Sequence, residues 1–153
     1  MTATIRLQRE DFDTAQEAAR LTQGRKDIGA VVTFTGICRN HEDGHGVAAL
    51  TLEHYPDMAE EEIGRHVAEA EQRWPLLGVT VIHRFGRMEP GDNIVLVVTA
   101  SAHRQAAFEA ASFLMDYLKT RAPFWKLEER PGGSAWVAAK ESDDDAATRW
   151  KTK

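Results

Sequence analysis

The strongest constraint on the fold is the run Asn-Ile-Val-Leu-Val-Val-Thr-Ala at residues 93–100. This run is nearly continuous in apolar and β-branched residues, which favour extended structure. A strand of this composition is typical of the interior of a sheet, where apolar neighbours surround it. The sequence therefore predicts a sheet built around residues 93–100.

Other segments predict the strands around this central one. Residues 29–36 form a β-branched and aromatic run between glycines, which predicts a well-buried strand. Residues 47–54 are expected to be its partner strand. Three further strands are expected, at residues 4–8, 79–85 and 134–139.

Three helices are predicted between these strands, at residues 13–21, at residues 57–73 and after Ser101. Ser101 is expected to cap the third helix, which ends near Lys119. Its predicted buried stripe consists of Phe108, Ala111, Leu114 or Met115, and Leu118. Strands mixed with three helices, and neighbouring strands joined by short turns, predict an α+β fold with a mainly antiparallel sheet.

Composition narrows the class of protein further. The 153 residues, 42% of them hydrophobic, suit a single domain spanning residues 1–153. The net charge of −5 disfavours nucleic acid and anionic membranes as partners. A single cysteine, Cys38, excludes an intrachain disulfide and fits a reducing compartment. With no apolar run of membrane-spanning length and no secretory pattern at the N-terminus, a soluble cytoplasmic protein is expected.

The segment at residues 117–128 concentrates groups that could carry chemistry. Lys119 and Lys126 flank Pro123, which cannot continue a helix. Two lysines on either side of such a bend can face one pocket, where they can move protons or attack a carbonyl. The alternative is that Lys119 only complements the helix C-terminal dipole while Lys126 is solvated.

A second group of basic residues predicts an anion site. With Ser101 as cap, His103 and Arg104 would lie in the first turn of the third helix, where free backbone N–H groups favour phosphate. Arg39 follows a predicted strand closely enough to reach a pocket at the sheet edge. The alternatives are a surface ion pair for Arg104, a packed His103 and a solvated Arg39.

The loop at residues 37–46 supports two weaker hypotheses. Cys38, His41 and His45 are possible metal ligands, although a closed zinc site needs a fourth ligand that this loop does not clearly supply. Cys38 could also be a nucleophile, but such a cysteine needs a base and an electropositive setting.

Several segments together resemble the catalytic large subunits of molybdopterin synthase. The most specific is Lys-Thr-Arg-Ala-Pro-Phe-Trp-Lys at residues 119–126. The others lie at residues 34–40, 52–55, 81–84, 90–92, 101–104, 115–118, 136–137 and 140–143. These segments cover most of the chain from about residue 29 to residue 150. The fold of that family is an α/β hammerhead, which is compatible with the predicted α+β class.

The resemblance implies a sulfurtransferase of molybdenum cofactor biosynthesis. The sulfur donor would be the C-terminal Gly-Gly thiocarboxylate of a small ubiquitin-like subunit. The acceptor would be cyclic pyranopterin monophosphate, which gains two sulfurs and becomes the dithiolene of molybdopterin. The implied assembly is a homodimer of this chain within a 2+2 heterotetramer, and the chemistry requires no metal or other cofactor.

The resemblance also assigns residues. It places the two essential lysines at Lys119 and Lys126, and it makes Lys140 the candidate for a basic residue borrowed from the other large subunit. The family often has a basic residue directly after the second lysine, where this chain has Leu127. The expected substrate-binding residues are Ile37, Cys38, Arg39, His103, Arg104, Lys119, Lys126, Leu127, Glu128 and Lys140.

Two other classes of protein stay open at this point. One is a binding protein that captures a ubiquitin-like tail without turnover, with the lysines as carboxylate anchors. The other is a zinc hydrolase built on Cys38, His41 and His45.

Overall fold

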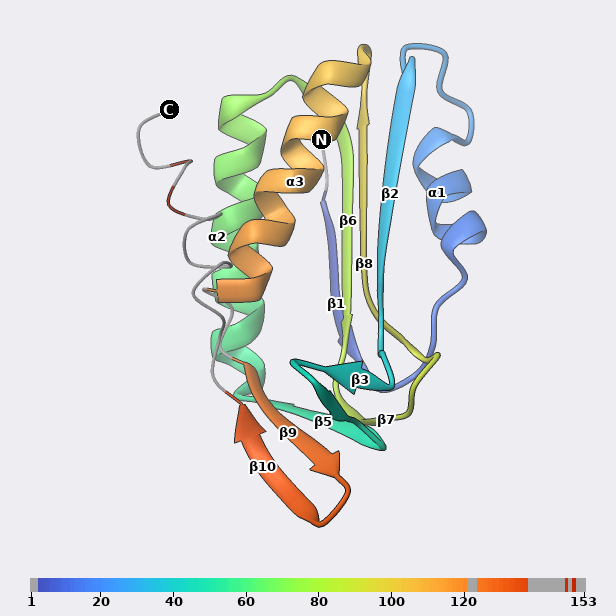
Figure 1. The fold of residues 1–153 in the computed structure, drawn as a ribbon. Helices are drawn as coiled ribbons and strands as arrows, with labels where there is room; N and C mark the ends of the chain where they lie inside the picture. Colours follow the sequence, from blue (N-terminus) through green and yellow to red (C-terminus); the bar gives the residue numbers. More distant parts are fainter. Residues whose placement is uncertain (1–2, 121–123, 138–147, 149, 151–153) are drawn as a thin grey trace.

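The computed structural model describes residues 3–120, 124–137, 148 and 150, and the elements in this part of the chain form two main sheets and three helices (Figure 1). The helices are α1 (Thr14–Thr22), α2 (Pro56–Arg73) and α3 (Arg104–Thr120). The strands are β1 (Thr4–Gln8), β2 (Ala30–Ile37), β3 (His41–Glu42), β4 (His45–Gly46), β5 (Ala49–His54), β6 (Leu76–Arg84), β7 (Gly86–Met88), β8 (Asn93–Ser101), β9 (Phe124–Arg130) and β10 (Gly133–Val137). Within the described residues, no helix is both long and apolar enough to cross a membrane.

The first sheet has the order β1-β6-β8-β2. β1 runs parallel to β6, whereas β6 and β2 both pair with β8 in antiparallel fashion. The prediction that residues 93–100 form an interior strand is therefore confirmed. The prediction that residues 29–36 are well buried is wrong. β2 lies at the edge of the sheet, and its residues are half-buried or exposed.

Helices cover both faces of this sheet, α2 and α3 on one face and α1 on the other (Figure 1). Val95 and Val97 of β8 pack in the cluster that includes residues of α2 and α3. Leu96 and Val98 point the opposite way and pack near α1. Successive residues of a strand face opposite sides, so a strand covered on both sides must be apolar throughout. This explains the continuous apolar run of β8.

The second sheet has the order β10-β9-β5-β7 and is antiparallel throughout. The expected pairing of residues 47–54 with residues 29–36 is wrong, because β5 pairs with β7 and β9 instead. The polar segment between β2 and β5, which carries the β3–β4 hairpin, is long enough for the chain to leave the first sheet and begin the second.

Aromatic rings join the two sheets where their strands end. His83 near the end of β6 stacks on Phe124 at the start of β9, with ring centroids 4.0 Å apart. His54 at the end of β5 lies 4.5 Å from Phe85 and 5.7 Å from Phe124 between ring centroids. Each such ring pair stabilises the folded state by about 1 kcal/mol beyond the contribution from burial of its surface. They fix the start of β9 beside the end of β6.

Side-chain hydrogen bonds tie α3 to the first sheet. Thr99 Oγ1 donates to the carbonyl oxygen of Ala107 at 2.7 Å, and both residues are fully buried. Ser101 is not the cap of α3, because it is the last residue of β8 and its hydroxyl donates to the Pro75 carbonyl oxygen at 3.0 Å. The helix begins at Arg104.

The stripe of α3 that packs on the sheet is displaced from the predicted one at its start. Phe108 is 61% exposed, because the buried positions of the first turns are Ala107 and Ala111. The stripe then continues as predicted with Leu114 and Leu118. Lys119 occupies the last turn of the helix, as expected, and Pro123 lies outside the described residues.

The close approach of the residue before β2 to the residue after β8 gives a stability prediction. A Cβ atom at Gly29 would lie 2.2 Å from the backbone oxygen of Ala102. The Gly29→Ala variant should therefore lose more than about 1 kcal/mol of unfolding free energy in a denaturant titration.

The matched control is Gly64→Ala inside α2, where the nearest atom to the added Cβ is Ile5 Cδ1 at 3.9 Å. Alanine favours the helix over glycine by about 0.5–1 kcal/mol, so this variant should be at least as stable as wild type. Equal effects of the two substitutions would contradict the analysis.

Candidate active site

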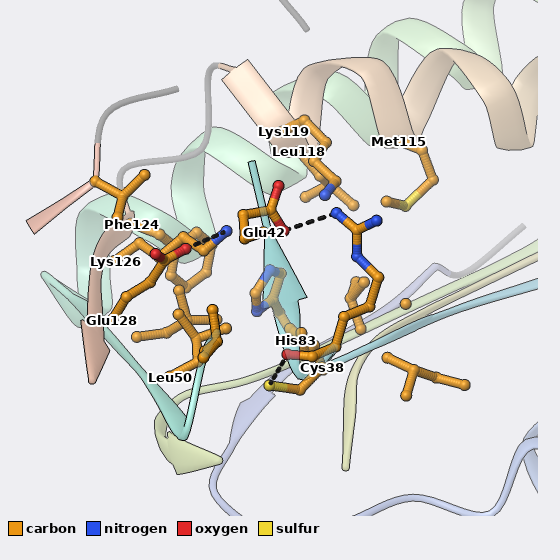
Figure 2. Close-up of a pocket in the computed structure, with 18 of the residues that line it drawn as sticks. Cys38, Glu42, Leu50, His83, Met115, Leu118, Lys119, Phe124, Lys126 and Glu128 are labelled. Carbon is orange, nitrogen blue, oxygen red and sulfur yellow. Dashed lines mark hydrogen bonds and ion pairs between the residues drawn. The ribbon is translucent and has the colours of Figure 1, made fainter. Parts of the chain in front are cut away.

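A cavity of about 390 Å³ lies between the C-terminal end of α3, β9 and the residues that follow β2 (Figure 2). This volume falls in the range of small-molecule sites. Its apolar lining includes Leu50, Met115, Leu118 and Phe124. Its polar and charged lining includes Arg39, Glu42, His83, Lys119, Lys126 and Glu128. A cavity with an apolar wall and several cations is suited to an anionic organic ligand.

Lys119 and Lys126 line the same cavity, although they belong to two separate elements. Lys119 is an exposed residue in the last turn of α3, and Lys126 is a half-buried residue of β9. Side chains alternate along a strand, so Lys126 shares the inner face of β9 with Phe124 and Glu128. Leu127 is not among the lining residues and points to the other face.

Glu128, on the inner face of β9, forms ion pairs with neighbouring basic side chains. Its side chain is 1% exposed, and its carboxylate accepts from His45 Nε2 at 2.9 Å and from Arg130 Nη2 at 3.0 Å. Lys126 Nζ lies 3.9 Å from the other carboxylate oxygen. Burial alone would raise the pKa of Glu128, but the His45 and Arg130 hydrogen bonds and the charge of Lys126 lower it overall. Glu128 is therefore an anion at neutral pH and a support for Lys126.

Arg39 follows β2 closely in the chain and contributes a third cation to the lining of the cavity. Its guanidinium donates to Glu42 of the β3–β4 hairpin, with Nη2 and Oε2 2.7 Å apart. The Arg39 side chain is 68% exposed, whereas that of Glu42 is 11% exposed. A guanidinium that remains this accessible still has donors for a ligand. Ile37 and Cys38, which precede Arg39, also contribute to the lining.

Cys38 lacks the setting of a nucleophile. It is 5% exposed, and burial together with Asp92 and Glu128 raises the pKa of its thiol, although Lys126 opposes this. A thiol with a raised pKa is unreactive at neutral pH. Within the described residues no three possible metal ligands gather, and His45 bonds to Glu128 instead of sharing a site with Cys38.

His103 and Arg104 lie at the far end of α3 from this cavity. Both are exposed, and neither belongs to its lining. Arg104 is the first residue of the helix, so the 15 residues to Lys119 span about 22 Å at 1.5 Å each. One copy of the chain therefore does not bring the expected anion-binding pair to the two lysines. Lys140 lies outside the described residues.

His83 is a polar lining residue that the sequence reasoning missed, as it also missed Glu42. It is 7% exposed and stacks on Phe124 inside the cavity. The alternation of side chains along a strand could have identified it. Val79 and Val81 are buried, and they lie on the same face of β6 as His83.

Comparisons with known proteins define the family. The family model described as "MoaE protein" matches residues 7–121. The "Molybdopterin synthase catalytic subunit" of Mesorhizobium japonicum is 66% identical over 151 residues, which are 97% of this chain and 94% of the relative. The protein of the same name from Escherichia coli is 57% identical over 92% of this chain and 93% of its own length.

Solved structures agree with this assignment. The "Molybdopterin biosynthesis MoaE protein" from Burkholderia ambifaria has a TM-score of 0.84 and 46% identity, covering 99% of this chain and all of that chain. The molybdopterin synthase structure from Staphylococcus aureus has a TM-score of 0.79 and 30% identity, covering 86% of this chain and 95% of that chain. The α+β fold thus matches that of the solved family structures. The chain belongs to the MoaE protein family, which confirms the resemblance drawn from the sequence.

The ion pairs of Glu128 give a pH-dependent prediction. Because the pKa of Glu128 is lowered below its ordinary value of 4.5, its charge stabilises the folded state above that pH and ceases to do so as the pH falls through the folded-state pKa. Glu128→Gln should lower the unfolding free energy by about 2 kcal/mol at pH 7. The deficit relative to wild type should shrink below pH 4.5.

Denaturant titrations at pH 7 and near pH 3 would measure this difference. Glu60→Gln, at an exposed position of α2, is the matched control and should unfold like wild type at both pH values. A deficit for Glu128→Gln that is constant with pH would contradict the role of its charge.

Proposed function

We propose that this chain is the catalytic subunit of a molybdopterin synthase. In this proposal it transfers sulfur from the C-terminal thiocarboxylate of a small ubiquitin-like subunit to cyclic pyranopterin monophosphate. The observation that carries the proposal is the cavity that Lys119 and Lys126 line together, in a chain 66% identical to a relative bearing that name. The Staphylococcus aureus structure, titled molybdopterin synthase, supports the same activity.

The lining of the cavity suits the two substrates in different ways. Arg39, Lys119 and Lys126 supply positive charge for a phosphate and a thiocarboxylate. A tail that ends in two glycines has no side chains to obstruct it in a narrow entrance. The apolar wall around Met115 and Leu118 gives one side of the cavity a low polarity, and electrostatic interactions of the cations are stronger beside such a surface than in bulk water.

The two lysines have the chemistry that sulfur transfer needs. The sulfur forms a bond to a side-chain carbon of the pterin substrate while a carbon–oxygen bond at that carbon breaks, and the oxygen leaves as water or stays on the opened phosphate. Water then adds to the acyl carbon, and the acyl–sulfur bond breaks to leave a carboxylate on the partner and the sulfur on the pterin. An ammonium group can stabilise the oxyanion formed at the acyl carbon, and an amine can accept the proton of the water. The raised pKa of the buried Cys38 thiol disfavours a covalent route through that residue.

A second copy of the chain completes the site in this proposal. His103 and Arg104 are exposed at the opposite end of α3, about 22 Å from Lys119 along the helix. In a twofold dimer each copy can present this pair to the cavity of the other, so that both cavities are completed together. The cyclic phosphate would then lie between groups from two chains.

The role of Lys119 is tested by single-turnover sulfur transfer from a thiocarboxylated small subunit. Lys119→Ala should lower the rate by about 10²–10⁴ because a positioned proton donor is lost. Lys26→Ala is the matched control, since Lys26 is exposed and does not line the cavity. A folded Lys119→Ala protein with wild-type turnover would disprove the assignment. Complex formation without product from wild type would instead favour a binding protein that captures the tail without turnover.

The contribution of a second copy is tested by mixing two inactive variants. If His103 and Arg104 act across a dimer, co-refolded Lys119→Ala and Arg104→Ala chains should regain activity. A mixed dimer has one intact site out of two, so random mixing should restore about a quarter of wild-type activity. Activity no higher than that of the separate variants would show that the residues act within one chain.

A further inference from the structure

The β3–β4 hairpin carries two polar side chains on one of its faces. Glu42 and His45 pair directly across the hairpin, and residues that pair in this way have their side chains on the same face. Asp43 and Gly44 form the turn between them, with φ angles of 48° and 82°. Two residues with positive φ suit a tight two-residue hairpin turn. Glu42 and His45 are therefore held close to each other by the backbone.

His45 attaches the hairpin to β9. Its Nε2 lies 2.9 Å from Glu128 Oε1. Glu128 is an anion at neutral pH and only accepts, so His45 Nε2 is the donor. The same carboxylate oxygen accepts from Arg130 Nη2 at 3.0 Å, and the Glu128 side chain is 1% exposed. Gly46 also lies beside the turn that follows β9, because a Cβ atom there would be 3.7 Å from Pro131 Cγ.

Glu42 reaches the cavity from this anchored hairpin. Figure 2 shows it among the side chains of the lining. Its carboxylate accepts from Arg39 Nη2 at 2.7 Å. The Glu42 side chain is 11% exposed and the Arg39 side chain is 68% exposed. The more enclosed carboxylate therefore restrains the more accessible guanidinium.

A carboxylate is an unexpected group in a cavity suited to anions, because its charge alone would weaken the binding of an anion. A long arginine side chain, however, loses conformational freedom when a ligand orders it, and this loss weakens binding. Glu42 can reduce that loss by ordering Arg39 before the ligand arrives. It occupies one N–H group and leaves the other donors of the planar guanidinium in fixed directions.

We propose that Glu42 is a positioning residue for Arg39, and that His45 holds the hairpin where Glu42 can reach that guanidinium. Arg39 then presents its remaining N–H groups to phosphate oxygens in the cavity. The kinetic part of this inference rests on the proposed function, in which Arg39 supplies charge for the phosphate of the pterin substrate. The ordering of Arg39 does not, and it is tested separately.

Two substitutions separate the charge of Glu42 from its hydrogen bond. Glu42→Gln and Glu42→Met both remove the negative charge and keep a similar side-chain length. Glutamine still offers an amide oxygen as acceptor, whereas the thioether of methionine accepts only weakly. The matched control is His41→Gln, because His41 is the exposed neighbour of Glu42 on β3 and does not line the cavity.

The order of Arg39 can be measured without any ligand. NMR relaxation of its Nε–H group, in protein made with isotope-labelled arginine, reports fast motion of the side chain. Glu42→Met should lower the order parameter of this group relative to wild type, and His41→Gln should leave it unchanged. A wild-type order parameter in a folded Glu42→Met protein would overturn the inference.

Binding of inorganic phosphate, followed by the chemical shift of the same group, tests the consequence. Phosphate should bind Glu42→Met about three- to tenfold more weakly than Glu42→Gln, because only glutamine can still order the guanidinium. If Glu42 acted through its charge alone, the two variants would bind phosphate equally, and more tightly than wild type. That result would contradict a positioning role.

The anchor is tested at His45. His45→Leu removes the donor to Glu128, whereas the amide of His45→Gln can still donate. Phosphate binding should weaken in the Leu variant and stay near the wild-type value in the Gln variant. Since both residues act through Arg39, the double variant Glu42→Met/His45→Leu should bind phosphate no more weakly than Glu42→Met alone. Additive losses would show that His45 does not act through Glu42.

In sulfur transfer, the KM for cyclic pyranopterin monophosphate should be about three- to tenfold higher in Glu42→Met than in Glu42→Gln, with the same kcat. If wild type makes product while Arg39 order and phosphate binding are unchanged in Glu42→Met, the role of Glu42 is wrong and the function stands. If both respond as expected while wild type makes no product, the positioning of Arg39 stands and the function is wrong.

Discussion

β8 is apolar on both faces, and the rest of the structure follows from covering both of them. α2 and α3 cover one face and α1 covers the other (Figure 1). The buried stripe of α3 then lies along the sheet, which carries Lys119 to the end of the sheet where β9 begins. The stacking of His83 on Phe124 fixes β9 there. The packing of apolar groups thus brings Lys119 and Lys126 to the same cavity.

Local charge in the cavity is opposite in sign to the charge of the whole chain. The net charge is −5, yet Arg39, Lys119 and Lys126 line one cavity. Their repulsion is offset by carboxylates held behind them, and Glu128 is the clearest case because it is 1% exposed and paired with Lys126 and Arg130. Burying that carboxylate keeps it from competing with an anionic ligand. An acidic protein can in this way offer a cationic cavity to an anionic substrate.

Sequence patterns predicted most of the elements, although not β9, and predicted the pairing of the strands less well. Periodicity identified β8 and the helices, because this signal is local. The edge position of β2 and the pairing of β5 with β9 depend on contacts between distant segments, which periodicity does not encode. His83 was missed for the same reason. Its strand pattern shows that it faces inward, but only β9 makes that position part of a cavity.

The separation of the basic residues along α3 has a consequence for assembly. A rigid helix of this length cannot bring Arg104 to Lys119 within one chain, since the two residues lie about 22 Å apart. In a twofold dimer every contact between the two chains occurs twice. If the start of α3 in one chain lies at the cavity of the other, the reverse is also true, and both sites are completed together. In the proposed dimer, substrate phosphate would then bind groups of both chains. Binding of substrate and stability of the dimer would be thermodynamically linked, each strengthening the other.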